Sequence, residues 1–98
     1  MNRVLQIRVG FFRFLKTRKL ERRLGAIGVL AFLKLYEFAI EFKPNGDLSG
    51  IPDDDLELAI DWMQGEPLIQ ALFELGLIEG EEGSRYLPGV IESGQKEE

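Results

Sequence analysis

Residues 26–42 read AIGVLAFLKLYEFAIEF, and this stretch decides the fold that the sequence predicts. Its charged residues are Lys34, Glu37 and Glu41, whose spacings of three and four residues place them on one narrow stripe of a helix. Nearly all other positions are apolar, so a helix here has to be covered on almost every side. At ~1.5 Å per residue it would be about 25 Å long, the span of a small domain. We therefore expect residues 26–42 to form a central core helix.

The segment before this helix, FLKTRKLERRLG at residues 14–25, concentrates positive charge. As a helix it would place Thr17, Leu20 and Leu24 on one face, and Gly25 stands where a C-terminal cap is expected. Five cations share the opposite broad side: Lys16, Arg18, Lys19, Arg22 and Arg23. Two interpretations stay open, a surface that binds nucleic-acid phosphates and a solvated face that pairs with acidic helices of the same domain.

Charge is divided unevenly along the 98-residue chain, whose net charge is −5. Residues 1–23 hold eight cations and one acid, a net of +7, whereas residues 24–98 hold four cations and sixteen acids, a net of −12. This asymmetry predicts either an end that faces a polyanion or internal electrostatic matching. In the first interpretation, Arg13 joins the five cations of residues 16–23 as a predicted nucleic-acid contact.

The remaining chain predicts short elements around the core helix. After a turn at KPNG, residues 47–49 can form an extended segment, and the acids that follow Pro52 open a helix over residues 53–63. Its predicted buried face repeats at helical spacing: Leu56, Ala59, Ile60 and Met63. A further helix over residues 66–76 begins with Glu66-Pro67 and ends at Gly76.

The two ends of the chain predict β structure and a tail. RVLQIRV at residues 3–9 indicates a short strand or extended arm, and LIEGEEGSRYL at 77–87 indicates a β-hairpin. Residues 88–98 are polar and predict a loose tail. The sequence therefore predicts a mainly α protein with a small β-hairpin, a single winged helix-turn-helix domain over residues 1–87.

Several short stretches give this chain a resemblance to a known family. They are RVGFF at 8–12, GDLSG at 46–50, the acidic helix start at 53–55, Trp62 near the end of that helix, and ELGLI at 74–78. The chain resembles, over about residues 5–87, the N-terminal winged-helix domain of phage replication proteins, which is related to replisome organisers and DnaD-like initiators. The resemblance implies DNA replication initiation, helicase-loader recruitment and oligomerisation. The chain departs from the family at GVIESGQKEE, where many relatives have a His-Asp-Trp ending.

The acidic character of the predicted helix-turn-helix bears on how DNA could be bound. A winged helix normally reads DNA with its second helix in the major groove, but here that helix carries Glu66 and Glu74, with Gln70 as its one candidate base-reader. Repulsion by phosphate therefore favours contact through the basic segment instead. A sequence-specific transcription regulator and a protein-interaction adaptor that binds no DNA remain the alternatives.

The apolar core helix also predicts association, because a chain of this length has little material with which to surround it. We expect a second copy or a replication partner to dock on its excess apolar surface. The predicted partner-binding residues are Trp62, Leu58, Phe38 and Phe42. For Trp62 two interpretations are equally open, an exposed anchor and a side chain lying across the protein's own edge.

Composition argues against several other classes of function. The chain has no cysteine and no histidine, which removes thiolate and imidazole metal ligands and the commonest general base. The acids at 53–55 lack the spacing of a calcium loop and are explained by the helix dipole. We expect no enzyme, no cofactor, no metal and no small-molecule substrate. With no signal peptide or apolar span in the sequence, we expect a soluble cytoplasmic protein.

Overall fold

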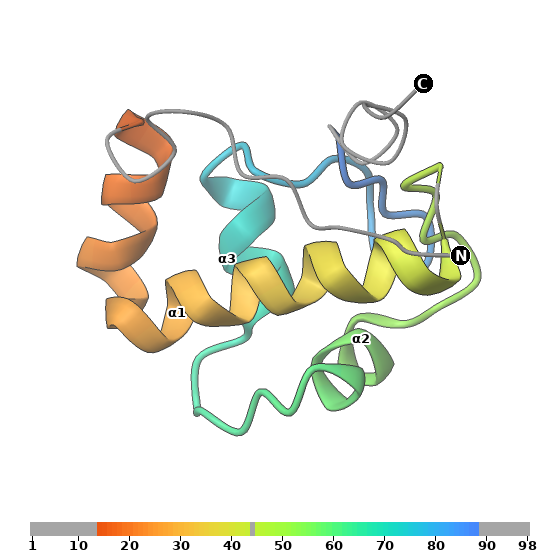
Figure 1. Cartoon of the computed structure of the whole chain (residues 1–98), viewed down its shortest axis with the longest axis horizontal. Coiled ribbons are helices and arrows are strands. Elements are labelled where there is room, and N and C mark those ends of the chain that lie inside the picture. Colours follow the sequence, from red (N-terminus) through yellow and green to blue (C-terminus); the bar gives the residue numbers. More distant parts are fainter. Residues whose placement is uncertain (1–13, 44, 89–98) are drawn as a thin grey trace.

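The computed structural model describes residues 14–43 and 45–88. Three helices follow one another along these residues, namely α1 (Leu15–Phe42), α2 (Asp53–Ala59) and α3 (Leu68–Glu74) (Figure 1). This confirms the prediction of a mainly helical protein. The predicted strand at residues 3–9 and the predicted tail after Pro88 lie outside the described residues.

Helix α1 changes direction sharply at Gly25, so that it consists of two straight halves (Figure 1). Gly25 has φ 77° and ψ −177°, backbone angles that are essentially restricted to glycine, and it interrupts an otherwise helical run. We call residues 15–24 the basic half-helix and residues 26–42 the core half-helix. The two helices predicted to meet at Gly25 are confirmed, and the bend allows both to pack on the same body of the protein.

The core half-helix supplies much of the hydrophobic core. Phe32, Leu35 and Ala39 are buried on one side, while the predicted charged stripe of Lys34, Glu37 and Glu41 is exposed. Three large apolar side chains of this half-helix are also at least half exposed: Ile27, Leu30 and Phe42. The central helix is therefore the core element that the sequence predicts, and its cover is incomplete.

Helix α2 is shorter than the predicted helix over 53–63, and its buried face differs. It ends at Ala59, and Asp61 takes a left-handed φ of 60°, which turns the chain away from the helix axis. As a result Trp62 turns into the core, whereas Ala59 and Met63 are exposed. The prediction that Ala59 and Met63 are buried is wrong: Met63 lies beyond the end of the helix, and Ala59, the last helical residue, is exposed.

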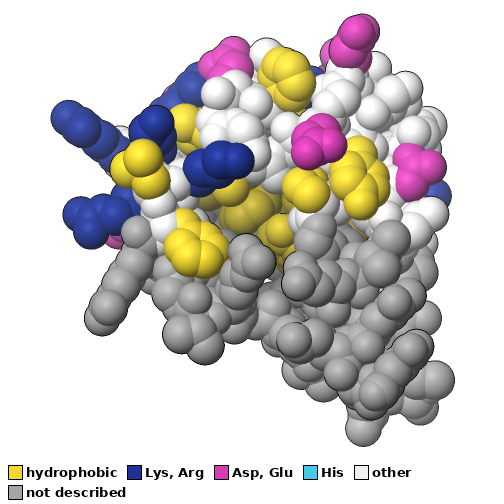
Figure 2. Space-filling model, turned by 90° about the horizontal axis from the view of Figure 1, so that it is seen from above, with side chains coloured by type: hydrophobic (Ala, Val, Ile, Leu, Met, Phe, Trp, Pro, Cys, Tyr) yellow, Lys and Arg dark blue, Asp and Glu magenta, His cyan; other side chains and the backbone are white. Residues whose placement is uncertain are grey.

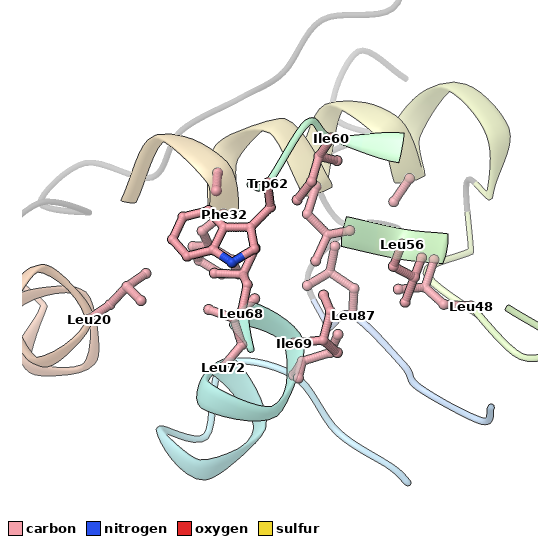
Figure 3. Close-up of a cluster of buried hydrophobic side chains, with 14 of the residues drawn as sticks. Leu20, Phe32, Leu48, Leu56, Ile60, Trp62, Leu68, Ile69, Leu72 and Leu87 are labelled. Atoms are coloured by element: carbon pink, nitrogen blue, oxygen red, sulfur yellow. The ribbon is translucent and has the colours of Figure 1, made fainter. Parts of the chain in front are cut away.

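Helix α3 and the loop before it close the core beneath α1. Leu68, Ile69 and Leu72 are completely buried, as is Leu20 of the basic half-helix. Figure 3 draws Trp62 among the buried side chains of this cluster, which also includes Phe32, and its indole Nε1 donates a hydrogen bond of 2.9 Å to the Glu66 carbonyl oxygen. The cluster thus joins all three helices, and the Trp62 hydrogen bond fixes the chain between α2 and α3.

Short antiparallel contacts complete the described structure. Residues 46–50 pair with 83–87 through three backbone hydrogen bonds of 2.8–2.9 Å, and Glu79 and Tyr86 exchange two more of 2.8 and 2.7 Å. Only isolated bridges result, Asp47 with Tyr86 and Glu79 with Tyr86, so the predicted hairpin over 77–87 is not confirmed as regular β structure. Gly80 and Gly83, with φ of 88° and 86°, turn the chain within a few residues of each bridge and keep the pairing short.

Candidate nucleic-acid interface

The basic half-helix is held in place by one apolar face. Leu20 is completely buried, Thr17 is 2% exposed, and Leu24 packs against the same core from its edge. These are the three residues that the sequence predicts on the inner face, and that prediction is confirmed. Because the inner face is fixed, the positions of the five cations follow from the helical rotation of 100° per residue.

All five cations of the basic half-helix are exposed. Arg18, Lys19 and Arg22 lie directly opposite the buried face, whereas Lys16 and Arg23 lie on one flank, toward α3. Figure 2 shows lysine and arginine side chains gathered at the end of the molecule that the basic half-helix forms. Arg13, the sixth predicted contact, lies outside the described residues.

Arg23 is bound by carboxylates of the same chain. Its Nε lies 2.7 Å from Glu66 Oε2 and its Nη1 lies 2.9 Å from Glu74 Oε1. The hydrogen bonds to Glu66 and then to Glu74 raise the pKa of Arg23 above its usual value. The pKa of Glu74 is lowered, first by a hydrogen bond from the Gln70 amide and then by the one from Arg23. For Arg23, the interpretation that the basic segment pairs with the chain's own acids is therefore correct.

Lys16 is also engaged within the molecule. Its Nζ donates a hydrogen bond of 3.1 Å to the carbonyl oxygen of Gly76, just beyond the C-terminus of α3. A cation at this place complements the negative end of the helix dipole. Lys16 and Arg23 thus both tie the basic half-helix to α3.

Arg18, Lys19 and Arg22 differ from these two cations. Among residues 14–43 and 45–88, none of the three forms an ion pair or a side-chain hydrogen bond. We call these three residues the cationic ridge. Within the described residues, the predicted group of five therefore divides into a ridge without a carboxylate partner and two residues, Lys16 and Arg23, that bind other parts of the chain.

The exposed stripe of α3 is fully occupied by contacts within the molecule. Gln70 and Glu74 lie one turn apart on this side of α3, and Glu66 lies two residues before the helix begins at Leu68. The two glutamates bind Arg23, and the Gln70 amide nitrogen donates a hydrogen bond of 3.1 Å to Glu74. The side chain of Gln70, which the sequence singles out as a candidate base-reader, is thus already hydrogen-bonded to Glu74 and Arg85.

Arg85 extends this set of contacts to α2, and sequence reasoning did not identify it. It is 2% exposed, and its guanidinium donates to the Asp53 carboxylate, the Gln70 side-chain oxygen and the Gly80 carbonyl oxygen. The guanidinium also lies 5.1 Å from the ring centroid of Phe73. The hydrogen bonds to Asp53 raise the pKa of Arg85 above its usual value. A signal was present, since Arg85 is one of only four cations among residues 24–98.

The same contact defines the role of the first acid of α2. The cap position of this helix is Pro52, which makes no side-chain cap hydrogen bond. Asp53 is the first helical residue, and its carboxylate binds Arg85 instead of capping the backbone. Within the described residues, no group of three or more His, Cys, Asp or Glu side chains is arranged to hold a metal ion.

The four predicted partner-binding residues differ in exposure. Trp62 is 7% exposed and hydrogen-bonded, which agrees with its lying in the protein's own core and not with an exposed anchor. Phe38 and Phe42 do lie together, with ring centroids 5.3 Å apart, and Phe42 is 61% exposed. Leu58 is 65% exposed on α2, a different element.

Comparisons of this chain with protein-family models, curated proteins and solved structures find no match. The resemblance to phage replication proteins accordingly stays a prediction. In the described part of the chain, no helix is both long enough and apolar enough to cross a membrane.

Proposed function

We propose that this chain is a non-enzymatic winged-helix module, of the kind found at the N-terminus of phage replication proteins. The order of its elements supports this assignment: two helical segments, a paired segment, two more helices, and two further paired segments. The pairing also supports it, because Tyr86 stands between Asp47 and Glu79, in the antiparallel order of a small three-stranded wing.

Within this fold, the proposed activity is sequence-independent contact with the phosphates of nucleic acid through the basic half-helix. The observation that carries the proposal is the cationic ridge, three exposed cations opposite the buried face that have no carboxylate partner in the described residues. Lys16 and Arg23 fix the orientation of the ridge through α3. Salt bridges from Lys and Arg to phosphate give affinity by releasing counterions and need no base contacts.

The state of α3 favours this activity over sequence-specific regulation. A regulator of this fold class would present α3 to the major groove. The exposed stripe of α3 carries Glu74, Glu66 lies just before the helix, and Gln70 is bound to Glu74 and Arg85. Reading a base edge would require breaking these contacts beside the phosphates that repel the glutamates.

Association with a second copy or with a replication partner is the other part of the proposal. Exposed apolar side chains on the core half-helix and on α2 support it, among them Phe42 and Leu58. The adaptor alternative keeps this association and omits the nucleic acid.

A charge-removal experiment tests the nucleic-acid contact. We would measure fluorescence anisotropy of labelled mixed-sequence duplex and single-stranded DNA at ~50 mM salt. The test variant is Arg18→Gln/Lys19→Gln/Arg22→Gln, and the control is Lys34→Gln/Lys43→Gln, which removes cations outside the basic half-helix. We expect a large loss of affinity in the first variant and a small one in the control. Equal, weak binding by all proteins would favour the adaptor, and strong preference for one palindromic site would favour the regulator.

A further inference from the structure

The bend at Gly25 joins the two halves of α1 without any connecting loop. Residues on both sides of Gly25 are helical, and Gly25 is the one non-helical residue within Leu15–Phe42. If its φ and ψ became helical, α1 would be one straight helix of 28 residues, about 42 Å long. A single backbone position therefore decides whether the basic half-helix folds back on its own chain.

No crowding around Gly25 enforces the bend. A Cβ atom built on Gly25 would meet no heavy atom within 4 Å. The bent form is thus maintained by the torsion angles of glycine and by the contacts of the basic half-helix, and not by crowding around the bend. Short hinges of this type are the ones that permit two copies of a chain to exchange an element.

The contacts of the basic half-helix that lie away from the bend would survive such an exchange. They are the burial of Thr17 and Leu20, the ion pairs of Arg23 with Glu66 and Glu74, and the hydrogen bond from Lys16 to Gly76. In a two-fold dimer with straight α1 helices, each of these contacts forms between the two copies and no longer within one copy. The bent and exchanged forms then differ at the hinge and wherever the two copies newly touch.

Apolar surface is present where that new contact would fall. Ile27 and Leu30 lie in the first turns after Gly25 and are 50% and 51% exposed. In an isologous dimer the two hinges face each other, so the side chains that follow one hinge approach those that follow the other. Their burial would offset part of the entropy lost on association.

We propose that two copies of this chain associate by straightening α1 at Gly25 and exchanging their basic half-helices, with Ile27 and Leu30 covered between them. This deepens the self-association in the proposed function by naming the partner as a second copy. It also places two cationic ridges on one particle. The nucleic-acid contact does not depend on it, because the ridge is already complete in one chain.

The first test changes the hinge. Gly25→Ala strains the bent form and favours the straight helix, where alanine is preferred to glycine. Each of the two hinges in the dimer should lower the dimer dissociation constant about tenfold. We therefore expect a constant roughly a hundredfold below that of the unchanged protein, measured by sedimentation equilibrium. The matched control is Gly83→Ala, which also has a positive φ and open space but lies outside α1. A folded Gly25→Ala protein that stays monomeric, or an equal shift in the control, would overturn the proposal.

The second test asks which chain holds each basic half-helix. Because the sequence has no cysteine, Arg23→Cys/Glu66→Cys introduces a unique pair at an observed contact. A short bis-maleimide reagent would join the two cysteines within one chain in the bent form and between two chains in the exchanged form. We expect interchain products in the Gly25→Ala dimer. Dimers that yield only intrachain products associate side by side and would refute the exchange.

Two further measurements keep the proposal testable if Gly25→Ala does not fold. The cysteine pair in the unchanged background, refolded from urea at about 1 mM, should give interchain products, and their absence would overturn the exchange. Leu30→Gln should weaken the dimer while leaving the folded monomer unchanged, since Leu30 is half exposed there. Proteins that bind DNA but never dimerise would refute this inference and leave the nucleic-acid proposal in place.

Discussion

The guanidinium of Arg85 donates two hydrogen bonds to the carboxylate of Asp53, with Nε 3.1 Å from Oδ1 and Nη2 2.8 Å from Oδ2. The two residues are 32 positions apart, and their side chains are 3% and 14% exposed. The pair connects the start of α2 to the segment that carries the two isolated bridges. A bidentate, desolvated pair of this kind is costly to break on one side, because the remaining charge stays buried.

We therefore expect Asp53→Ala to lower the free energy of unfolding by about 3 kcal/mol. The matched control is Asp54→Ala, the next residue of α2, which is exposed and should change stability by less than about 0.5 kcal/mol. Urea unfolding followed by circular dichroism measures both. Equal stability of the two variants would contradict the importance of the pair.

The double variant Asp53→Leu/Arg85→Met provides a separate check of the same pair. Removing both charges leaves no unpaired buried charge, so the double variant should be more stable than Asp53→Ala. Urea midpoints of the two proteins make the comparison. A double variant less stable than Asp53→Ala would show that the other contacts of Arg85, with Gln70 and Phe73, matter more than the pair itself.

Trp62 and Met63 make a second matched comparison, because they are adjacent and opposite in burial. Trp62→Ala should cost about 3–5 kcal/mol, since it removes a large buried side chain and leaves the Glu66 carbonyl without its donor. Met63→Ala should cost less than about 0.5 kcal/mol because its side chain is 71% exposed. Circular dichroism during urea unfolding measures the difference, and the reverse order of costs would contradict the observed end of α2.

The division of the five cations predicts the salt dependence of DNA binding. With three ridge cations neutralising phosphates, the slope of log K against log salt should be about −2.7, whereas five would give about −4.5. Arg22→Gln should reduce the steepness by about one, and Arg23→Gln should leave it nearly unchanged, because Arg23 is bound to Glu66 and Glu74. Anisotropy titrations between 25 and 200 mM salt would measure these slopes. A slope equally sensitive to both substitutions would contradict the division.

The lowered pKa of Glu74 predicts how acid acts on the contact between α1 and α3. A carboxyl group whose pKa is lower in the folded state stabilises the fold above its ordinary value of 4.5, and this contribution is lost as the pH falls below that value. The pKa measured by NMR should lie below 4.5 and should rise toward it in Gln70→Ala and in Arg23→Gln. A Glu74 pKa that is unchanged in both variants would contradict the observed hydrogen bonds.

The sequence was sufficient for those features that depend on neighbouring residues. The two helices that meet at Gly25 followed from apolar spacing and from one glycine, and the inner face of Thr17, Leu20 and Leu24 followed from the helical wheel. The end of α2 could not be predicted in this way, because the apolar spacing continues to Met63 while the backbone turns at Asp61. Nothing in the side-chain pattern distinguishes a helix that ends at Ala59 from one that ends at Met63.

The candidate site was predictable as a region and not as a set of contacts. The surplus of cations in residues 16–23 is visible in the sequence, but Arg23 meets Glu66 across 43 positions. Which cations stay available is decided by where α3 lies relative to the bend, and that depends on packing of the whole core. Arg85 was missed for the same reason, since its partners come from α2, from α3 and from Gly80.

The interior position of Arg85 and the surface position of the cationic ridge imply opposite responses to added electrolyte. At 0.1 M salt, mobile ions largely screen attractions between solvated charges that are more than about 10 Å apart, and higher salt shortens this distance, whereas a desolvated pair is screened much less. A concentrated salt wash should therefore remove any polyanion that the cationic ridge binds, while the Asp53–Arg85 contact keeps α2 in place. Purification in such a buffer would give the folded protein free of carried-over nucleic acid, which is the starting material that every binding measurement on it requires.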